Sequence, residues 1–539
     1  MSLGFMAQKQ KLGRLSNLIV CTLLITGSCL ASALLPVELN LTDLSVEADH
    51  VAYLDDGETI VASQNVLVRY KRFRITADRF VYSPNNRQLS LYDDVTIFHR
   101  DTTLKAETVF IDFSTLSGTA QSIIFQSNRL RITGHDLSFN DEKITITDVF
   151  YSTCQPTDFP NYRVKSAALS IYPKSGGMFA KHDFLYINTL PVFYFPSFFY
   201  QSRNYALIQS SELYGNQNDI VQKDQLPIPK FGSNSLEGSY IKAYFGYVMS
   251  DHSFGSYLLA NTSDQGPLFG VSHTHLSSPS DRFVIVANSY AKRGFQGGIR
   301  YIRDVNAQTQ DPALKTALDS LFDTFVPTRF IPVSQLSITA MRNQRMTDSW
   351  VDYMPQLKLV VDKLPLTDSI SLSNLTSYDY TIEDYPDRPH RLKSDRFQCH
   401  TTLAKTVRLT PSLNAIYSIS GLYSSYAHTS AWGRGFTALE LKWSPSRWSS
   451  SIKYTKKLVN RGRSVFHFDS VNAITNDEIG LSLSTKLGSI GYETVYAVNV
   501  ETNEPRSLTH ALIYSFDCMS VSGQWDVIQK SITFGIGVL

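Results

Sequence analysis

The chain has 539 residues, of which 43% are hydrophobic, 12% aromatic and 18% charged; this apolar share can bury a core and excludes a wholly disordered protein. Fifty lysines and arginines against 48 acidic residues leave a formal net charge of +2 without a long basic run, which excludes a dedicated nucleic-acid binder. The length allows two or more domains or one large β unit, and 29 tyrosines and 31 phenylalanines favour β structure.

Residues 1–33 have the pattern of a secretory signal peptide. A basic segment at residues 9–14 precedes a short apolar run at residues 18–30, and Ala31-Ser32-Ala33 supplies the small residues of a cleavage site. An uncleaved anchor helix is the alternative. The rest of the sequence has no continuous apolar stretch of about 18 residues, so we expect an exported chain that is free in its compartment or crosses a membrane as a closed barrel.

A sequence register recurs about every 29 residues between residues 42 and 150. One column consists of residues 48–53, 77–82, 106–111 and 134–139, with steps of 29, 29 and 28 residues. A second column starts at Asn65, Asp94 and Ser122, and a third consists of Ile75, Leu104 and Ile132. A fixed period indicates stacked structural units, and the apolar alternation of period two within each unit predicts strands.

The first column places its apolar side chains on one face of the predicted strands. These residues are Val51, Tyr53, Phe80, Tyr82, Val109, Ile111, Leu137 and Phe139. They form either the dry core of a β-solenoid or jelly roll, or the inner face of an open, folded-over sheet that receives fatty acyl chains. Burial of apolar surface contributes about 25 cal/mol per Å² without directional preference, so the second interpretation is energetically feasible, and periodicity does not decide between the two.

The repeat, ADxxxY followed by NVxV, resembles the OstA/LptA-type periplasmic domain of the lipopolysaccharide transport system. The following region resembles the outer-membrane lipopolysaccharide-assembly proteins of the LptD family. The residues that carry this second resemblance are YSTCQP at 151–156, YRVKS at 162–166 and FLYINTLPVFYFP at 184–196. The resemblance implies an all-β chain with a jelly-roll-like β-domain at residues 42–157 and a transmembrane antiparallel β-barrel at residues 160–539.

The sequence departs from this family in its cysteines and in the length of its C-terminal region. Cys154, Cys399 and Cys518 remain after the predicted signal peptide, and three thiols allow one disulfide whose pairing stays open. The 380 residues from 160 to 539 suit roughly 14–20 membrane strands. The best-known members of the family have more strands.

The C-terminal half also has the pattern of a barrel without the resemblance. Residues 492–500 and 508–518 alternate between apolar and polar side chains, as the strands of transmembrane barrels do. A large soluble β-sandwich is the alternative. Residues 311–325 instead have helical spacing after Asp311-Pro312, and we expect a helix there within a long loop.

Two prolines, Pro191 and Pro196, suit a strand that is not fully paired on both sides, because proline has no backbone N–H. The resemblance implies that they mark a lateral gate between the first and last barrel strands. Alternatively, they only shape the entry from the domain to the barrel.

The sequence contains no nucleophile elbow, P-loop, HExxH motif or CxxC pair, so we predict that the chain is not an enzyme and needs neither a cofactor nor a metal. His273 and His275 would share a face of a strand, but without an acidic or cysteine partner nearby we interpret them as barrel-wall or loop residues.

The resemblance implies a function in lipopolysaccharide or lipooligosaccharide assembly in the outer membrane of a Gram-negative bacterium, with the N-terminal domain in the periplasm. It implies an LptA-like bridge protein that delivers the lipid and an LptE-like lipoprotein that plugs the barrel. The alternatives are a general porin with a periplasmic interaction domain and a barrel enzyme that acts on lipids.

Overall fold

The computed structural model shows an all-β chain, as the sequence predicts. It describes residues 44–538 apart from 55–58, 71–72, 100–101, 116, 128–129, 141, 155–159, 173–176, 202–228, 235–236, 251, 279, 308–331, 347–348, 385–390, 428–430, 446–447, 472–476, 517 and 529. The predicted signal peptide at 1–33 and the predicted helix at 311–325 lie outside the described residues.

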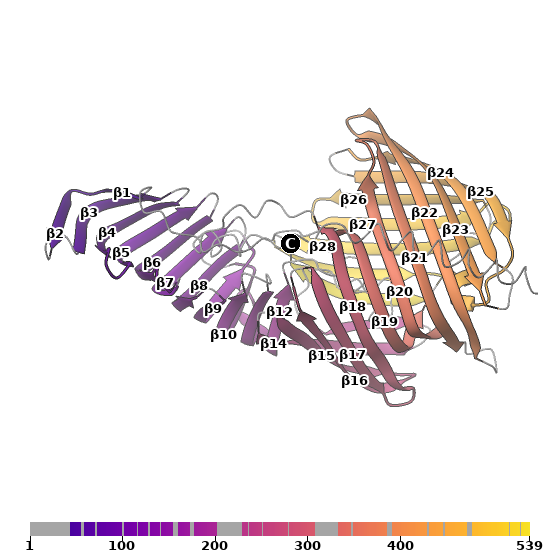
Figure 1. Cartoon of the computed structure of the whole chain (residues 1–539), viewed down its shortest axis with the longest axis horizontal. Coiled ribbons are helices and arrows are strands. Elements are labelled where there is room, and N and C mark those ends of the chain that lie inside the picture. Colours follow the sequence, from indigo (N-terminus) through magenta and orange to yellow (C-terminus); the bar gives the residue numbers. More distant parts are fainter. Residues whose placement is uncertain are drawn as a thin grey trace, which may run out of the picture. The chain divides into compact units, whose positions relative to one another are not determined.

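The N-terminal part is a single antiparallel sheet of 12 strands (Figure 1). Its strands are β1 (Leu44–Glu47), β2 (His50–Leu54), β3 (Thr59–Tyr70), β4 (Phe73–Ser83), β5 (Gln88–His99), β6 (Thr102–Asp112), β7 (Ser117–Ser127), β8 (Leu130–Phe139), β9 (Ile144–Ser152), β10 (Tyr162–Tyr172), β11 (Gly177–Ile187) and β12 (Leu190–Gln201). From β3 to β12 each strand pairs with the next, while β1 and β2 both pair with β3. One 29-residue repeat is therefore one β-hairpin.

The sheet is bent across the middle of its strands. The register shifts between Ser63 and Val66 in β3 and between Tyr92 and Val95 in β5, and left-handed backbone occurs at these points, with φ of 52° at Asn65. Asparagine and aspartate tolerate this conformation best among residues that carry a side chain. The second column of the repeat thus marks β-bulges. The bulge in β5 lies at Asp93 and Asp94, both of which have left-handed backbone.

The first column begins on the inner side of the same bend, where only a small side chain fits. Ala77 and Ala106 are buried there, and Gly134 takes the equivalent place in β8. A Cβ atom on Gly134 would overlap Cγ2 of Ile146. The close approach of the two halves of the bent sheet explains why the repeat keeps alanine or glycine at this point.

The C-terminal part is a closed antiparallel barrel of 18 strands, within the predicted range of 14–20 (Figure 1). Its strands are β13 (Lys230–Asn234), β14 (Gly238–Ser250), β15 (Ser253–Thr262), β16 (Gly266–Leu276), β17 (Asp281–Tyr290), β18 (Gly294–Ala307), β19 (Pro332–Met346), β20 (Ser349–Pro365), β21 (Ile370–Asp384), β22 (Leu392–Thr410), β23 (Leu413–Tyr426), β24 (Trp432–Trp443), β25 (Trp448–Arg461), β26 (Glu478–Leu487), β27 (Ile490–Asn499), β28 (Pro505–Phe516), β29 (Met519–Asp526) and β30 (Ser531–Val538). Neighbouring strands are consecutive in sequence, and β13 pairs with β30 to close the ring.

The pairing between β13 and β30 is the shortest in the barrel. Only Phe231, Gly232 and Ser233 pair across it, whereas β14 pairs with β15 at ten positions. We call this junction the seam. Because each ladder position contributes backbone hydrogen bonds, the seam is the weakest interstrand junction among the described strands.

The boundary between the two parts lies later than the sequence predicted. Strands β10, β11 and β12 continue the sheet to Gln201, and the first barrel strand begins at Lys230, so the boundary expected at 157–160 falls within the sheet. The 29-residue sequence repeat is not recognisable after β9, although the alternation of buried residues continues through β10 and β11.

The prolines expected at a lateral gate also belong to the sheet. Pro191 and Pro196 lie in β12, which is the last strand of the sheet and pairs with β11 alone. Proline is tolerated in such a terminal strand because one edge needs no ladder hydrogen bonds. The seam, at which no proline stands among its paired residues, is formed by β13 and β30 instead.

A disulfide and a buried cluster join the sheet to the barrel. Cys154, after β9, is bonded to Cys518, in the turn between β28 and β29, while Cys399 is a free thiol on β22. The cluster around this bond contains Tyr162, Val164, Leu185, Phe195 and Met519, with Ile536 of β30 packed against it. We call these residues the junction cluster, and the barrel end at which it lies the near end.

A second contact is made by β12 and β14. The Ser197 hydroxyl donates a hydrogen bond of 2.6 Å to the carbonyl oxygen of Gly246, and a Cβ atom on Gly246 would overlap Cβ of Phe199. Glycine at position 246 therefore allows the two backbones to approach closely. The rings of Phe199 and Phe254 also lie 4.8 Å apart.

Helical structure is scarce in the described residues. The short helix α4 (His467–Val471) follows β25. No helix in the part of the chain that the structure describes is long and apolar enough to cross a membrane.

Candidate functional site

The predicted apolar stripe is continuous across the sheet. Strand register aligns Val51, Ala62, Phe80, Leu91, Val109, Ala120, Leu137 and Ile146 as cross-strand neighbours from β2 to β9. A parallel line contains Tyr53, Ile60, Tyr82, Leu89, Ile111, Gly118, Phe139 and Ile144. We call these the first and second inner rows. All eight predicted stripe residues lie in them.

A third inner row lies in the other half of the bent strands. It contains Val46, Val68, Ile75, Ile97, Leu104, Phe125, Ile132, Tyr151, Val164, Leu185 and Phe193. Its central members are buried, as are those of the first two rows. Since the sheet is one layer, the burial of all three rows means that the two halves of the fold cover each other.

The rows differ in exposure along the sheet. Five of the predicted stripe residues in the middle of the sheet are at most 5% exposed, namely Phe80, Tyr82, Val109, Ile111 and Leu137. Phe139 is half-buried. Val51 and Tyr53 in β2 are 46% and 69% exposed, because β1 and β2 form the edge of the sheet. The structure thus places the stripe in a closed apolar interior whose accessible part is the β2 edge.

The opposite end of the third inner row leads into the junction cluster. Val164 and Leu185 belong to both, and Phe193 packs against the cluster beside Ile536. Ile536 lies in β30, one of the two seam strands. The third inner row therefore links Val46 at the β1 edge of the sheet with the strand that closes the barrel, and the first two inner rows, which begin at β2, line the same interior as far as β9.

A buried carboxyl group borders the third inner row near the junction cluster. The carboxyl of Asp183 in β11 is fully buried, accepts a hydrogen bond from the Ser166 hydroxyl, and has an Oδ2 atom without a hydrogen-bond partner among the described residues. Burial raises the pKa of Asp183 to about 7. Near neutral pH this carboxyl is therefore partly protonated.

The barrel wall has apolar side chains outside and polar side chains inside. Outward residues pair across strands, as Leu259 does with Phe269 and Ile285 with Ile299, and all four are exposed. The inner face carries charged residues that are nearly fully buried, including Lys242, Arg282, Arg300, Asp304, Asp379 and Arg396. This is the arrangement of a transmembrane β-barrel, and the barrel is of the outer-membrane type.

The inner wall formed by β14–β19 is filled by its own side chains. Lys242 contacts Glu237 at 2.9 Å, and Tyr290 donates a hydrogen bond of 3.3 Å to the same carboxylate. Arg282 pairs with Asp304, whose other oxygen accepts a 2.7 Å hydrogen bond from Gln335. These paired charges make this side of the barrel a packed polar wall.

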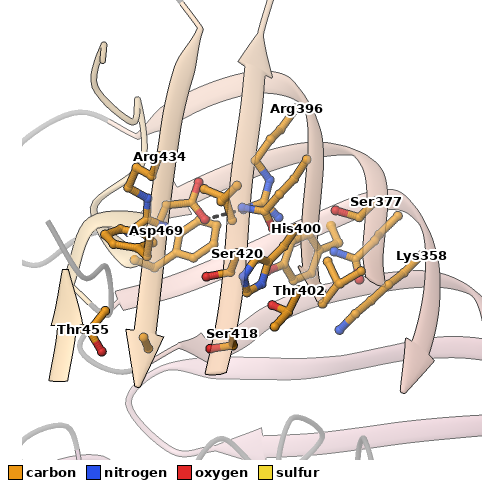
Figure 2. A pocket seen from close by; sticks show the side chains of 18 of the residues that line it. Lys358, Ser377, Arg396, His400, Thr402, Ser418, Ser420, Arg434, Thr455 and Asp469 are labelled. Atoms are coloured by element: carbon orange, nitrogen blue, oxygen red, sulfur yellow. Dashed lines mark hydrogen bonds and ion pairs between the residues drawn. The ribbon is translucent and has the colours of Figure 1, made fainter. Parts of the chain in front are cut away.

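The inner wall formed by β20–β25 instead borders a cavity of about 540 Å³, which we call the luminal chamber. Figure 2 shows its side chains converging from several strands, with Arg434 and Asp469 on one side and Lys358 on the other. Hydroxyl groups line it at Ser377, Thr402, Ser418, Ser420 and Thr455. No sequence motif marks this chamber, because its lining comes from strands separated by up to about a hundred residues, each of which contributes a few alternate side chains.

The segment that carries α4 folds against the inner wall at the far end of the barrel. Glu383 of β21 accepts hydrogen bonds from the backbone N–H groups of His467 and Phe468 at 2.6 and 2.8 Å. Arg396 of β22 joins Asp469 of this segment, at 2.5 Å, to Asp379 at 3.0 Å. Phe466 and Phe468 pack in a buried cluster with Tyr353, Tyr426 and Trp432. We call residues 464–471 the luminal segment.

The two predicted wall histidines lie on β16. His273 is half-buried and hydrogen-bonds to the hydroxyls of Tyr247 at 3.0 Å and Ser253 at 3.1 Å. Within the described residues, no group of three or more His, Cys, Asp or Glu side chains could hold a metal ion.

Comparison with known proteins adds a likeness in fold only. No protein-family model and no curated protein matches the chain. Among solved structures, Pseudomonas aeruginosa OccK10 (OpdN) matches with 8% identity and a TM-score of 0.30, covering 57% of this chain and 95% of that one. A bacterial polysaccharide outer membrane secretin has 7% identity and a TM-score of 0.29, covering 57% and 96%.

The P pilus usher (PapC) translocation pore matches over 89% of this chain and 94% of that one, with 9% identity and a TM-score of 0.22. At these scores the likenesses carry no weight for function. The class of protein follows from the strand pairing and the two-sided wall: an outer-membrane-type β-barrel preceded by a bent, apolar-lined sheet.

Proposed function

We propose that the chain assembles lipopolysaccharide, or a related lipooligosaccharide, into the outer leaflet of a Gram-negative outer membrane. The observation that carries the proposal is the apolar interior that leads from the edge formed by β1 and β2 to Ile536 beside the seam. An apolar track suits acyl chains because its attraction is non-directional and allows sliding. The polar inner wall of the barrel suits the saccharide.

Lipid would enter at the β2 edge, from the periplasm. β1 and β2 pair only with β3 in the described part of the chain, so their outer edges are available for strand addition. A bridge protein with a similar sheet, of the LptA type, would dock there and continue the inner rows through the exposed Val51 and Tyr53. The sheet would then be the last segment of a periplasmic lipid bridge.

Passage along the middle strands requires the two halves of the bent sheet to part. Phe80 and Val109 are covered by the chain itself, so acyl chains must take the place of the side chains that cover them. An acyl chain contributes about 0.8 kcal/mol for each CH₂ group that it buries, which offsets the apolar surface that the two halves expose when they separate.

Lipid would leave at the seam. The junction cluster brings the track to β30, and three paired positions are the smallest barrier to lateral opening among the described strand pairs. The acyl chains would move sideways into the membrane while the saccharide passes through the lumen. An LptE-like lipoprotein would complete the plug that the luminal segment begins.

A reversible lock across the seam tests this proposal. Ser233 and Ile532 pair across it, so Ser233→Cys with Ile532→Cys would crosslink β13 to β30. In a depletion strain, the oxidised double variant should lose surface lipopolysaccharide and regain it with reductant. The control pair Leu259→Cys with Phe269→Cys crosslinks β15 to β16 and should keep surface lipopolysaccharide. Normal surface lipopolysaccharide with a locked seam would refute the lateral exit.

A general porin is the second candidate, favoured by the polar luminal chamber of about 540 Å³. A porin reconstituted in a planar bilayer shows a steady open conductance, whereas a lipid translocon with a plugged lumen conducts little. Conductance therefore discriminates between the two functions.

A further inference from the structure

We propose that a buried polar cluster in the bent sheet, made of Ser166 and Asp183 beside Tyr151, is a binding site for a hydroxyl group carried on an acyl chain. The inference rests on the proposed function, because it concerns acyl chains that travel through the interior of the sheet. It names the chemical class of the lipid, a hydroxylated aliphatic chain, and the residues that recognise it.

The cluster replaces apolar residues on the inner side of the bend. In each earlier hairpin an apolar side chain there pairs across strands with alanine or glycine, as in Val66–Ala77, Val95–Ala106 and Ile123–Gly134. The next equivalent pair is Val149 with Ser166, and the Ser166 hydroxyl donates a hydrogen bond to Asp183. The apolar line along the bend therefore ends in two polar side chains, both of them fully buried.

Asp183 faces the interior of the sheet. The pairing of β11 with β12 is regular from Asp183 to Leu185, so these two side chains lie on the same face, and Leu185 belongs to the third inner row. Phe195, the cross-strand neighbour of Asp183, is fully buried in the junction cluster. An acyl chain that follows the third inner row towards the barrel therefore passes the carboxyl of Asp183.

One oxygen of this carboxyl is available to a ligand. Ser166 donates its hydrogen bond to Oδ1 of Asp183, whereas Oδ2 is buried and has no hydrogen-bond partner among the described residues. Such an oxygen costs free energy, so a polar group that meets it inside the sheet is held more strongly than a CH₂ group at the same place.

Tyr151 adds a second polar group to the cluster. Burial raises the pKa of its hydroxyl well above the usual value, and the nearby carboxyl of Asp183 raises it further. Tyr151 is therefore a neutral phenol, which both donates and accepts hydrogen bonds. It lies in the third inner row, opposite Val164.

The chemistry of Asp183 favours a hydroxyl group over the other polar groups of a lipid. Burial raises the pKa of Asp183 to about 7, so near neutral pH its carboxyl is an acceptor in one form and a donor in the other. A hydroxyl group matches both forms, whereas an ester carbonyl only accepts. A phosphate is disfavoured by its own charge in a buried site. The apolar neighbours Val149 and Leu185 suit an aliphatic chain that continues on both sides of the hydroxyl.

Photo-crosslinking of two matched esters to the purified full-length chain in detergent tests the inference. A photoreactive phenylalanine derivative replaces Phe193, which is half-buried and pairs with Leu185. The probes are methyl ricinoleate and methyl oleate, which differ by one hydroxyl group in the middle of the aliphatic chain. We expect methyl ricinoleate to reach half-maximal crosslinking at an about fivefold lower concentration, because it gains a hydrogen bond in a buried site. Equal half-maximal concentrations would overturn the inference.

Two variants assign this preference to Asp183. Asp183→Leu replaces the carboxyl by an aliphatic group and should make the two half-maximal concentrations equal, whereas Asp183→Asn keeps a polar oxygen and should keep most of the preference. Glu107→Leu is the matched control, because Glu107 also accepts a hydrogen bond from a serine, Ser122, but is exposed.

The readout is the ratio of the two half-maximal concentrations. A purely structural role of Asp183 would alter the crosslinking of both esters alike and leave their ratio unchanged. A retained preference in Asp183→Leu, or an equal loss of preference in Glu107→Leu, would therefore overturn the inference.

The surface lipopolysaccharide of a depletion strain separates this inference from the proposed function. A chain that prefers methyl ricinoleate but does not restore surface lipopolysaccharide refutes the proposed function and supports the site. A chain that restores it and crosslinks both esters equally refutes the site and leaves lipid assembly supported. Crosslinking of neither ester would refute both the passage of acyl chains at Phe193 and the site.

Discussion

At the scale of single residues, the bend of the sheet determines which side chains recur. The inner side of the bend admits only alanine or glycine, and the bulge beside it favours asparagine or aspartate. These two requirements made the 29-residue repeat visible in the sequence. The intervening strands carry Leu91, Ala120 and Ile146 into the same first inner row, but no repeated motif marks them. Their alternation of period two was the one signal that could have revealed them.

Asp183 gives the sheet a dependence on pH. Its carboxyl has a pKa of about 7 in the folded chain and near 3.8 in the unfolded chain, so the folded state holds a proton that the unfolded state releases. The stabilising contribution is complete below about pH 4 and is lost as pH rises through 7. We expect hydrogen exchange in β9–β11, corrected for its intrinsic rate, to become faster between pH 5 and pH 8.

Asp183→Asn should remove most of the difference in exchange rate between pH 5 and pH 8 by slowing exchange at pH 8. The reason is that the asparagine amide needs no proton to remain neutral. Glu142→Gln changes an exposed carboxyl before β9, keeps Asp183, and should behave as the wild type. The same rise in exchange in Asp183→Asn would show that another group causes it.

At the scale of elements, the luminal segment is the feature that the sequence indicated least. The alternation in the barrel strands predicted a barrel, but the pattern of one strand does not reveal which loop folds inward. The packing of Phe466 and Phe468 against Tyr353 and Tyr426 depends in part on residues more than a hundred positions apart. Contacts at such separations become visible only once strand order and register are known.

Releasing the luminal segment should open the barrel. Glu383→Gln with Asp469→Asn removes the charge that caps the start of α4 and breaks the ion pair with Arg396. We expect the single-channel conductance in planar bilayers to rise severalfold over the wild type. Asp395→Asn, which alters an acidic residue next to Arg396 but on the outer face of β22 with Phe397, should leave the conductance unchanged. A high conductance in the wild type would favour the porin function instead.

At the scale of the whole molecule, the disulfide joins two distant parts of the chain. Three mature cysteines allowed three pairings, and the structure selects Cys154 with Cys518 across 364 residues. Sequence spacing could not select this pair, because the two residues meet only through the docking of the β28–β29 turn at the end of the sheet. The resemblance likewise placed the prolines at a gate, whereas strand order places them in β12.

Loss of the disulfide should loosen the connection between sheet and barrel. For a loop of this length, the chain-entropy model gives a stabilisation of about 6 kcal/mol as an upper value. Cys154→Ser should lower the midpoint of thermal unfolding of the full chain in detergent and add one thiol that reacts with maleimide in the denatured protein. Cys399→Ser removes the free thiol and should keep the midpoint. Equal midpoints for Cys154→Ser and the wild type would show that the junction cluster alone holds the parts together.

If the proposed function holds, acyl chains travel through the interior of the bent sheet, and site-specific photo-crosslinking in living cells detects this route. Val109 and Phe110 are adjacent on β6; Val109 is buried in the first inner row, while Phe110 is exposed on the outer face. A photoreactive residue at position 109 should crosslink to lipopolysaccharide, and one at position 110 should not. Val109→Asp should abolish crosslinking from a photoreactive residue at position 80. Crosslinking at 110 as strong as at 109, or none at 109 in cells whose surface lipopolysaccharide depends on this chain, would contradict the account.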